Sequence, residues 1–406
     1  MSSAAFRRPV EPPSPEALIA RARALVPLIR ARAEETERNR RISPEIIAEV
    51  REAELLRTTR PREFGGFEFD PTVALEIALT ISAACASTGW AVNGALSNGI
   101  SFGHYPTETQ RELWGDGADP FSCACFAPTG TAVPTAGGYR LSGKWSFASG
   151  VDHASWIRLG AFIKSPEPGA DAPAEGAFFL LPIGDVEVED NWFVYGLCGT
   201  GSKNIIVDKA FVPDHRVLRF ADTRAGRTAG ADHHPNPVYR LPLLVLGASM
   251  LASTAVGAAK GALADYLEMT TGRTTRGALA GGGLAMAEFA TVQLRFAEAS
   301  AAAEAAELIL MTNLKNAMAK LRAGDEITVA DRIRTRRDQA YATKLALQAV
   351  EALNASTGGA GLQLSNPIQR AWRDVNAVAR HVSLNWDAVG TMYGQHAFGL
   401  EPRGQY

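Results

Sequence analysis

The hydrophobic pattern changes twice along the chain and therefore predicts three regions. In residues 1–120, apolar residues recur at the spacing of amphipathic helices. Three stretches begin with a capping residue followed by proline: SPEAL at Ser14, SPEIIAEV at Ser43 and DPTVALEIAL at Asp70. Serine and aspartate accept hydrogen bonds from the first free N–H groups of a helix, and proline fits its first turn. We expect an N-terminal α-helical domain in residues 1–120.

The middle region has the short, interrupted runs that are typical of strands. YRLSGKWSFAS, SWIRLGAFI, GAFFLLPI and NIIVDKAFVP are separated by Gly and Pro. They predict a small β domain in residues 121–235. Its last part, RAGRTAGADHHPNPVYRLP, is loop-like, and we expect His233 and His234 to be solvated there. No third ligand with a recognisable spacing accompanies the two histidines, so no metal site is predicted.

The last region, residues 236–406, returns to helical spacing. Helices are predicted over residues 248–271, 285–321 and 329–355, and from about residue 366. The segment QRAWRDVNAVARHVSLNWD, residues 369–387, is predicted as one helix. Four helices of this length and Ala/Leu content favour a C-terminal four-helix bundle. The fold class is thus α+β and mainly α.

Composition and charge narrow the classes of function. The net charge of -2 comes from 41 basic and 43 acidic residues scattered along the chain, which argues against nucleic-acid or membrane-surface partners. The apolar runs are interrupted by Gly, Ser and Lys, and the N-terminus lacks the apolar core of a signal peptide, so a cytoplasmic location is expected. Cys85, Cys123, Cys125 and Cys198 lack zinc or disulfide spacing and are expected to be buried.

Several catalytic motifs are missing from the sequence. It has no GxGxxG between a strand and a helix, no GxxxxGK[ST], no HExxH and no GxSxG. Phosphate-loop nucleotide hydrolysis, Rossmann-type NAD binding, zincin proteolysis and α/β-hydrolase chemistry are therefore disfavoured.

Three segments carry a resemblance to a known family. They are GGYRLSGKWSFASGVDHASWIRLGA, WFVYGLCGTGSKNIIVDKAFVPDHRVL and NPIQRAWRDVNAVARHVSLNWD. With the order of helices, β domain and bundle, they resemble the oxygenase components of two-component flavin-dependent monooxygenases over essentially the whole chain. The resemblance implies the acyl-CoA dehydrogenase fold. It also implies a homotetramer formed through the bundle, and a separate NAD(P)H:flavin reductase that supplies FMNH2 or FADH2.

A missing glutamate separates two chemistries on this fold. In acyl-CoA dehydrogenases of the commonest type, a glutamate just after the segment that matches RDVNAVARH abstracts the α-proton of the thioester. Here that place falls at or next to Val382, which cannot take a proton. The resemblance implies a different role for the neighbouring His381, which would lie beside the flavin and supply or hold the proton of a C4a-hydroperoxide that forms with O2. Composition alone favours a helix histidine satisfied by a backbone carbonyl, and the motif match reverses this preference.

The resemblance also implies contacts to the flavin from the β domain. In KWSFASG, Trp145 would flank the flavin and Ser149 would be the hydroxyl nearest N5, with Ser146 as the other possible register. In FAPTG, Phe126 and Thr129 would line the pyrimidine side. Each segment could also be an ordinary edge strand or turn.

Two further segments are expected at the flavin. Ser202 in GLCGTGSKN would add a hydroxyl, although a tight turn explains those glycines equally well, and relatives usually carry Arg at the position of Cys198. Arg273 or Arg276 would hold the flavin phosphate, since the arginine fork suits phosphate oxygens. Two arginines near a helix end are otherwise often just solvated.

One departure from the family bears on the substrate. Phenol-hydroxylating relatives carry a histidine base between GW and FP, where this chain has Asn98. An amide forms hydrogen bonds but cannot deprotonate a phenol, and His104 lies on a different helix face. The substrate is expected to be a small phenol- or indole-like aromatic that is oxygenated without this base. The alternatives are an acyl-CoA dehydrogenase or oxidase with a relocated base, and a non-catalytic helical interaction protein.

Overall fold

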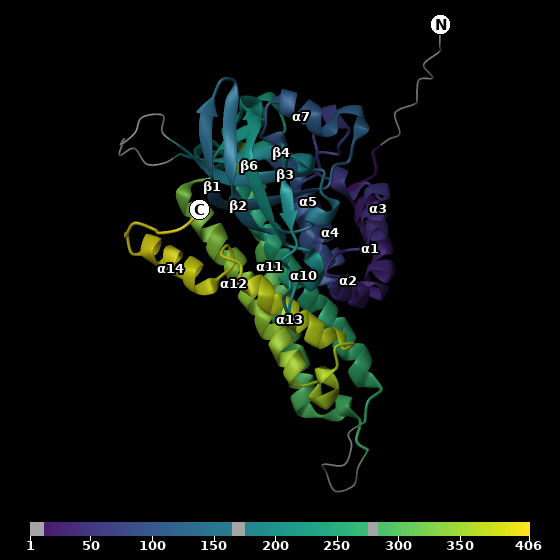
Figure 1. Cartoon of the computed structure of the whole chain (residues 1–406). Coiled ribbons are helices and arrows are strands. Elements are labelled where there is room, and N and C mark those ends of the chain that lie inside the picture. Colours follow the sequence, from purple (N-terminus) through teal and green to yellow (C-terminus); the bar gives the residue numbers. More distant parts are fainter. Residues whose placement is uncertain (1–11, 165–174, 275–282) are drawn as a thin grey trace.

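The computed structural model describes residues 12–164, 175–274 and 283–406. Helices and one sheet follow each other in the expected order, and an elongated bundle extends below the sheet (Figure 1). The N-terminal part consists of α1 Pro15–Ala31, α2 Ala33–Asn39, α3 Pro44–Glu52, α4 Pro71–Ala84, α5 Ala86–Leu96, α6 Asn98–Gly103 and α7 Thr107–Trp114. The side chains of Ser14, Ser43 and Asp70 accept hydrogen bonds from first-turn N–H groups, which confirms the three predicted helix starts.

The β region forms a single seven-stranded sheet in the order β5-β6-β2-β1-β3-β4-β7. β1 and β3 pair in parallel, and the other neighbours are antiparallel. The strands are β1 Ser122–Thr135, β2 Gly138–Ala148, β3 Trp156–Ile163, β4 Glu175–Pro182, β5 Glu187–Glu189, β6 Lys203–Pro213 and β7 Val217–Arg219. The connection to the bundle contains α8 Phe220–Ala225 and α9 Ala229–His233.

The bundle consists of α10 Leu243–Thr271, α11 Ala290–Ala323, α12 Val329–Ala355 and α13 Pro367–Ala379, followed by α14 Trp386–Ala397. The prediction of one helix over residues 369–387 was wrong. α13 ends at Ala379, and a turn separates it from α14. Asn385 explains the break, because its side chain accepts a hydrogen bond from Ala388 N–H and so starts a new helix. His381 consequently lies in a turn.

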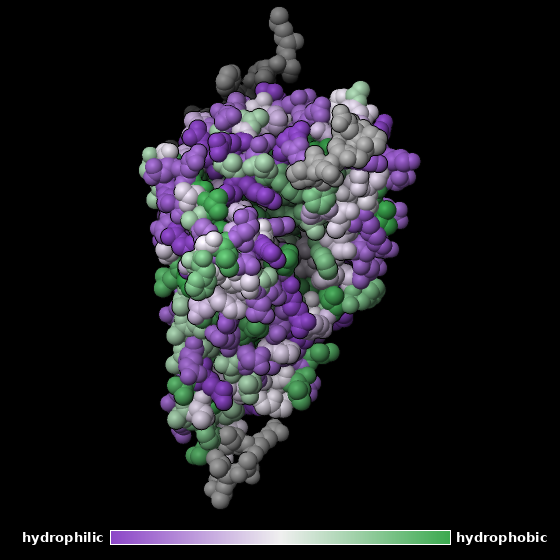
Figure 2. Space-filling model, turned by 90° about the vertical axis from the view of Figure 1, so that its left-hand side faces the viewer, coloured by the Kyte–Doolittle hydropathy of each residue, from purple (hydrophilic) through white to green (hydrophobic). Residues whose placement is uncertain are grey.

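The N-terminal helices and the bundle share one hydrophobic core. α4 and α5 pack against α10, and the buried apolar residues of all these helices are continuous from Leu18 to Leu384. The sheet has its own core cluster. α10 is long and apolar enough to cross a membrane, but 78% of its most apolar stretch is buried in the protein. On the face in Figure 2, hydrophobic and hydrophilic residues are interspersed, and no continuous apolar band crosses that face.

All four cysteines are buried and unpaired, as expected. Burial raises the pKa of the Cys125 thiol to about 12 and that of Cys198 to about 11. The thiols are thus small core residues.

Candidate active site

Two segments that were expected at a flavin lie where the strands leave regular pairing. The β1–β3 register shifts between Cys125 and Gly130, and the β2–β6 register shifts between Trp145 and Ala148. Phe147, inside the second bulge, has a φ of +71° and is 67% exposed. Bulges and strained non-glycine residues are concentrated at functional sites, because they redirect side chains at a cost in backbone energy.

A chain of hydroxyl groups begins at the end of β2. Trp90 Nε1–H donates to Ser149 Oγ at 2.8 Å, Ser149 and Ser202 hydroxyls are 2.6 Å apart, and Ser202 and Thr200 hydroxyls are 2.6 Å apart. Thr200 donates its proton to Leu197 O at 2.8 Å. Each hydroxyl has only one proton to donate, so Thr200 must accept the proton of Ser202. The Ser202 hydroxyl must in turn accept the proton of Ser149. Ser149 keeps one lone pair free and can only accept a further hydrogen bond.

His381 reaches the same place from the turn between α13 and α14. Its ring lies 5.6 Å from the Trp90 ring in an edge contact. Ser383 N–H donates to His381 Nδ1 at 3.1 Å, so the neutral ring carries its proton on Nε2. Burial, and then the charge of Arg336, lower the pKa of His381 to about 4. Trp90 therefore joins two of the predicted catalytic residues, His381 and Ser149.

Trp90 and Arg336 were not predicted from the sequence. Trp90 lies in the GW pair that served only as a landmark for alignment. Arg336 lies on α12, is 3% exposed, and donates to Ser383 O at 2.8 Å. A charged residue at a buried helix position was the available signal for Arg336.

Other predicted flavin contacts are placed differently. Trp145 is 1% exposed in the sheet core, where its Nε1–H donates to Gly160 O, so its side chain does not face a ligand as expected. The physical reason is strand alternation, which turns Trp145 inward and Ser146 outward. Thr129 is exposed and donates to Lys144 O at 2.8 Å. The Ser202 hydroxyl accepts the hydrogen bond from Ser149 and so orients the Ser149 hydroxyl.

The glycines of GLCGTGSKN serve the protein's own packing. A Cβ at Gly196 would lie 2.4 Å from Arg373 O, and one at Gly199 would lie 2.3 Å from the Thr36 side chain. The loop thus presses against α13 and α2. Asp374 on α13 accepts a hydrogen bond from Leu197 N–H at 2.6 Å and is 5% exposed. One oxygen of this carboxylate therefore holds the loop.

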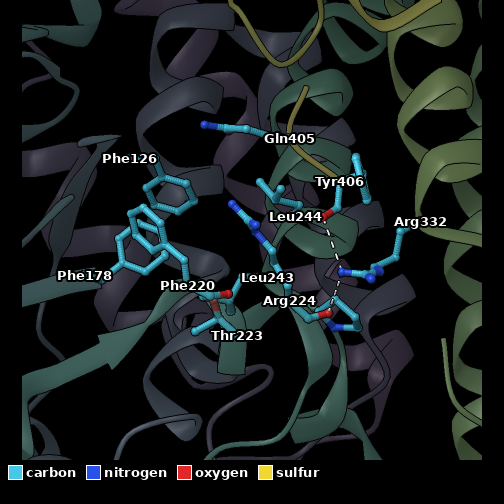
Figure 3. A pocket seen from close by; sticks show the side chains of 11 residues that line it. Phe126, Phe178, Phe220, Thr223, Arg224, Leu243, Leu244, Arg332, Gln405 and Tyr406 are labelled. Carbon is cyan, nitrogen blue, oxygen red and sulfur yellow. Dashed lines mark hydrogen bonds between the residues drawn. The ribbon is translucent and has the colours of Figure 1, made fainter. Parts of the chain in front are cut away.

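Phe126 lies in the wall of a small cavity near α10 and the C-terminal residues (Figure 3). Its ring packs 4.9 Å from that of Phe178, and Phe220 extends the aromatic wall. Arg332 donates to Tyr406 O on the opposite side. The cavity holds about 40 Å³, well below the roughly 150 Å³ that accommodates benzene. It is therefore not an aromatic-substrate site in this conformation.

Asn98 and the arginines complete the predicted set. Asn98 is buried at the start of α6 and donates from Nδ2 to Ser122 Oγ at 2.6 Å. His104 is a core histidine whose Nε2 forms a hydrogen bond with Leu241 O. Arg273 donates to Thr357 O at 2.9 Å, and Arg276 lies outside the described residues.

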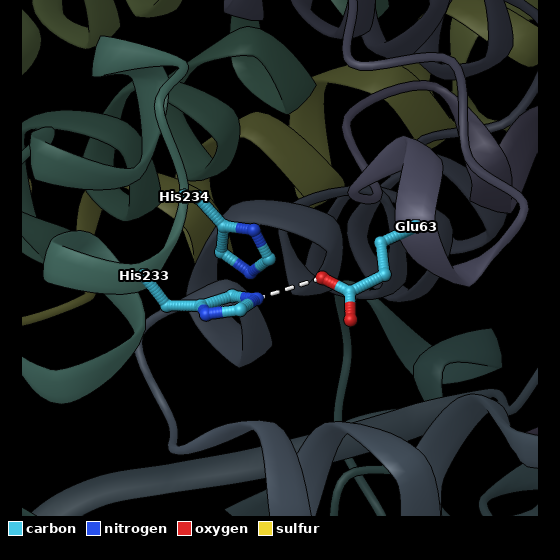
Figure 4. A group of neighbouring side chains, drawn as sticks. All are labelled: Glu63, His233 and His234. Carbon is cyan, nitrogen blue, oxygen red and sulfur yellow. Dashed lines mark hydrogen bonds and ion pairs between the residues drawn. The ribbon is translucent and has the colours of Figure 1, made fainter.

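The two histidines differ: His233 is exposed, as expected, whereas His234 is buried. His233 ends α9, His234 is 4% exposed, and Glu63 from the N-terminal part approaches both (Figure 4). His233 bonds to Glu63 at 2.7 Å, and His234 Nε2 donates to Gln110 Oε1 at 2.9 Å. The Gln110 amide is oriented by its N–H bond to Tyr105 O. His234 is thus a buried residue held by Gln110, and His233 is an exposed residue paired with Glu63 from a distant segment.

Exposed apolar side chains lie on segments next to the hydroxyl chain and His381. Phe147, Phe193 and Val382 are 67%, 72% and 73% exposed, and Tyr195 is also exposed. Phe147 contacts Trp192, and the Arg380 guanidinium lies over Tyr195. We call these four side chains the apolar rim; exposed apolar side chains of this kind often mark a ligand-binding surface.

Comparisons with known proteins agree with this geometry. The acyl-CoA dehydrogenase N-terminal domain matches residues 15–117, and the acyl-CoA dehydrogenase C-terminal domain matches residues 249–386. The FADH2-dependent resorcinol hydroxylase, oxygenase component, of Rhizobium sp. (strain MTP-10005) is 45% identical over 394 residues, which cover 96% of each chain.

Solved structures give the same assignment. The 3-HSA hydroxylase from Rhodococcus sp. RHA1 has a TM-score of 0.89 at 33% identity, covering 95% of this chain and 97% of its own. XiaF from Streptomyces sp., in complex with FADH2 and glycerol, has a TM-score of 0.88 at 29% identity, covering 96% and 97%. These relatives favour the oxygenase interpretation over the dehydrogenase and the non-catalytic alternatives. The chain belongs to the acyl-CoA dehydrogenase family and, within it, to the reduced-flavin-dependent monooxygenases that act as oxygenase components.

Proposed function

We propose that the chain hydroxylates a small phenol of the resorcinol type, using FADH2 that a separate NAD(P)H:flavin reductase delivers. The observation that carries the proposal is the meeting of His381, Trp90 and Ser149 at one apolar-rimmed site. The 45% identity to a resorcinol hydroxylase component supports this substrate class, and the FADH2 dependence of that relative supports FAD over FMN. A cytoplasmic homotetramer is part of the same proposal.

The residues present fit a reduced flavin. When bound, reduced flavin supplies the two electrons that activate O2, so that one oxygen atom of O2 can enter the substrate and the other leaves as water. Ser149 offers a lone pair, which suits the N5–H of reduced flavin and not the N5 lone pair of the oxidised form. His381 offers Nε2–H as a donor to the reacting oxygen while the ring stays neutral. Phe147 and Val382 are exposed apolar side chains that a bound flavin or substrate could cover.

The substrate class also accounts for Asn98. A resorcinol ring carries two electron-donating hydroxyl groups, so it is reactive towards an electrophilic oxygen without prior deprotonation. Asn98 directs its N–H towards Ser122, which leaves the amide oxygen to accept from a substrate hydroxyl. Asn98 then positions a phenol and does not act as its base.

The test is anaerobic mixing of the purified protein with FADH2, followed by oxygenated buffer in a stopped-flow instrument. We expect an absorbance transient before the oxidised flavin spectrum, and hydroxylated resorcinol that carries label from 18O2. His381→Val should abolish the transient, whereas His396→Val on α14 should keep it. Immediate flavin oxidation without a transient, in the presence and absence of resorcinol, would contradict the proposal.

A further inference from the structure

Arg336 is a buried cation beside the His381 turn. It projects from α12 and is 3% exposed. It donates to Gln339 Oε1 at 2.8 Å, to Ser383 O at 2.8 Å and to Gln405 O at 3.2 Å. All three acceptors are neutral, and no carboxylate among the described residues pairs with this guanidinium. A buried charge without a counter-ion is costly, so its retention calls for a role.

The first effect of Arg336 is geometric. The peptide units that flank Ser383 link the two side chains, because Ser383 O accepts from Arg336 while Ser383 N–H donates to His381 Nδ1. Gln339 supports this clamp from behind, since its amide nitrogen donates to Val245 O and Ser249 Oγ on α10 at 2.9 Å each. The Gln339 oxygen is thereby directed at Arg336. The turn that holds the imidazole is thus anchored to the core of the bundle.

The second effect is electrostatic. Arg336 is the charged group that acts on His381, and its positive charge disfavours a second one on the imidazole. The elements packed around the ring provide the Trp90 ring from α5, Arg336 and Gln339 from α12, and the Ser383 backbone from the turn itself. Among these contacts, none brings a carboxylate that would favour an imidazolium. The hydrogen bond to Nδ1 and the positive charge of Arg336 therefore both favour the neutral form of the His381 ring.

We propose that Arg336 is a positioning residue for His381: by holding the Ser383 peptide and placing a buried positive charge beside the imidazole, it keeps the ring neutral with its proton on Nε2. The catalytic consequence rests on the proposed function. A neutral ring offers a hydrogen bond from Nε2–H throughout the working pH range. An imidazolium would instead transfer a full proton to the reacting oxygen and favour its loss as H2O2.

The test measures the ring itself, in the flavin-free protein. Deuterium exchange of the imidazole C2 proton depends on protonation, and mass spectrometry reads it for the His381 peptide as a function of pH. We expect the midpoint below pH 5 in the wild type and a measurably higher midpoint in Arg336→Gln, because a nearby like charge is removed while the burial of the ring remains. Arg332→Gln is the matched control: it removes an arginine one turn away on α12 that contacts Arg224 O and Tyr406 O.

The outcomes separate the possibilities. An unchanged midpoint in Arg336→Gln, or an equal rise in Arg332→Gln, would overturn the proposal. Arg336→Lys, which keeps the charge, should retain a low midpoint, and it decides the question if the Gln variant fails to fold by circular dichroism. With FADH2 and O2, Arg336→Gln should shorten the absorbance transient more at pH 6 than at pH 8. Absence of any transient in the wild type would count against the proposed function alone, since the exchange experiment contains no flavin.

Discussion

Replacing Asp374 by asparagine should stabilise the protein at neutral pH although it removes a buried hydrogen-bonding charge. Burial raises the pKa of Asp374 to about 6, against 3.8 for an ordinary aspartate, and the hydrogen bond from Leu197 N–H only partly offsets this. The folded state therefore binds more protons than the unfolded state between these pH values, and the stability of the wild type falls as the pH rises through this window.

The magnitude follows from the two pKa values. A difference of roughly two pKa units corresponds to about 3 kcal/mol of unfolding free energy, fully expressed at pH 7 and mostly absent at pH 4. The asparagine side chain remains neutral at both pH values and can still accept from Leu197 N–H. We therefore expect the variant to gain up to about 3 kcal/mol at pH 7 relative to its effect at pH 4.

Urea unfolding followed by circular dichroism gives the free energy of unfolding of both proteins at pH 4 and at pH 7. The quantity to compare is the stability change caused by Asp374→Asn at pH 7 minus the change at pH 4. Asp325→Asn, at an exposed position after α11, is the control and should show little pH-dependent change. Equal effects of Asp374→Asn at both pH values would refute the reasoning. If confirmed, the result would mean that the chain retains a buried carboxylate that destabilises the fold at neutral pH although an amide could accept the same hydrogen bond from Leu197 N–H.

Three other predictions concern the site. Trp90→Phe keeps the ring contact to His381 but loses the hydrogen bond to Ser149. The absorbance transient should therefore decay about fivefold faster, which corresponds to roughly 1 kcal/mol. An unchanged lifetime in stopped-flow traces would argue against a role for that hydrogen bond. Asn98→His should introduce a base and raise turnover of monophenols relative to resorcinol, measured by product chromatography, whereas an identical substrate ratio would contradict the role of Asn98. Ser149→Ala should weaken FADH2 binding by about 1 kcal/mol and leave oxidised FAD binding nearly unchanged in anaerobic titrations; equal losses for both forms would disprove its acceptor role.

The architecture was accessible from the sequence because its signals are local. Ser14, Ser43 and Asp70 marked helix starts that depend on neighbouring residues only. The strands of the β domain followed from short apolar runs between Gly and Pro. His381 was selected by a motif match, and the missing glutamate at Val382 needed no three-dimensional information.

The errors have a common physical origin in contacts between distant segments and in irregular backbone. The orientation of Trp145 depends on strand register beside a bulge, where a shift of one residue reverses the side that a residue faces. His234 depends on Gln110, which lies far away in the chain. The end of α13 was missed because the capping strength of Asn385 competed with a continuous helical pattern. The environment of Arg336 exists only after the bundle has assembled.

The shared core of the N-terminal helices and the bundle has a consequence for the order of folding during synthesis. α4 buries its apolar face against α10, which the ribosome completes only after the entire β domain. The first helices must therefore leave the ribosome with exposed apolar surface, and they depend on long-range closure that is slow to form. The sheet, with its own core, can fold before the helices on either side of it do. A nascent chain that stops before α10 should bind chaperones, whereas one that includes the bundle should be released.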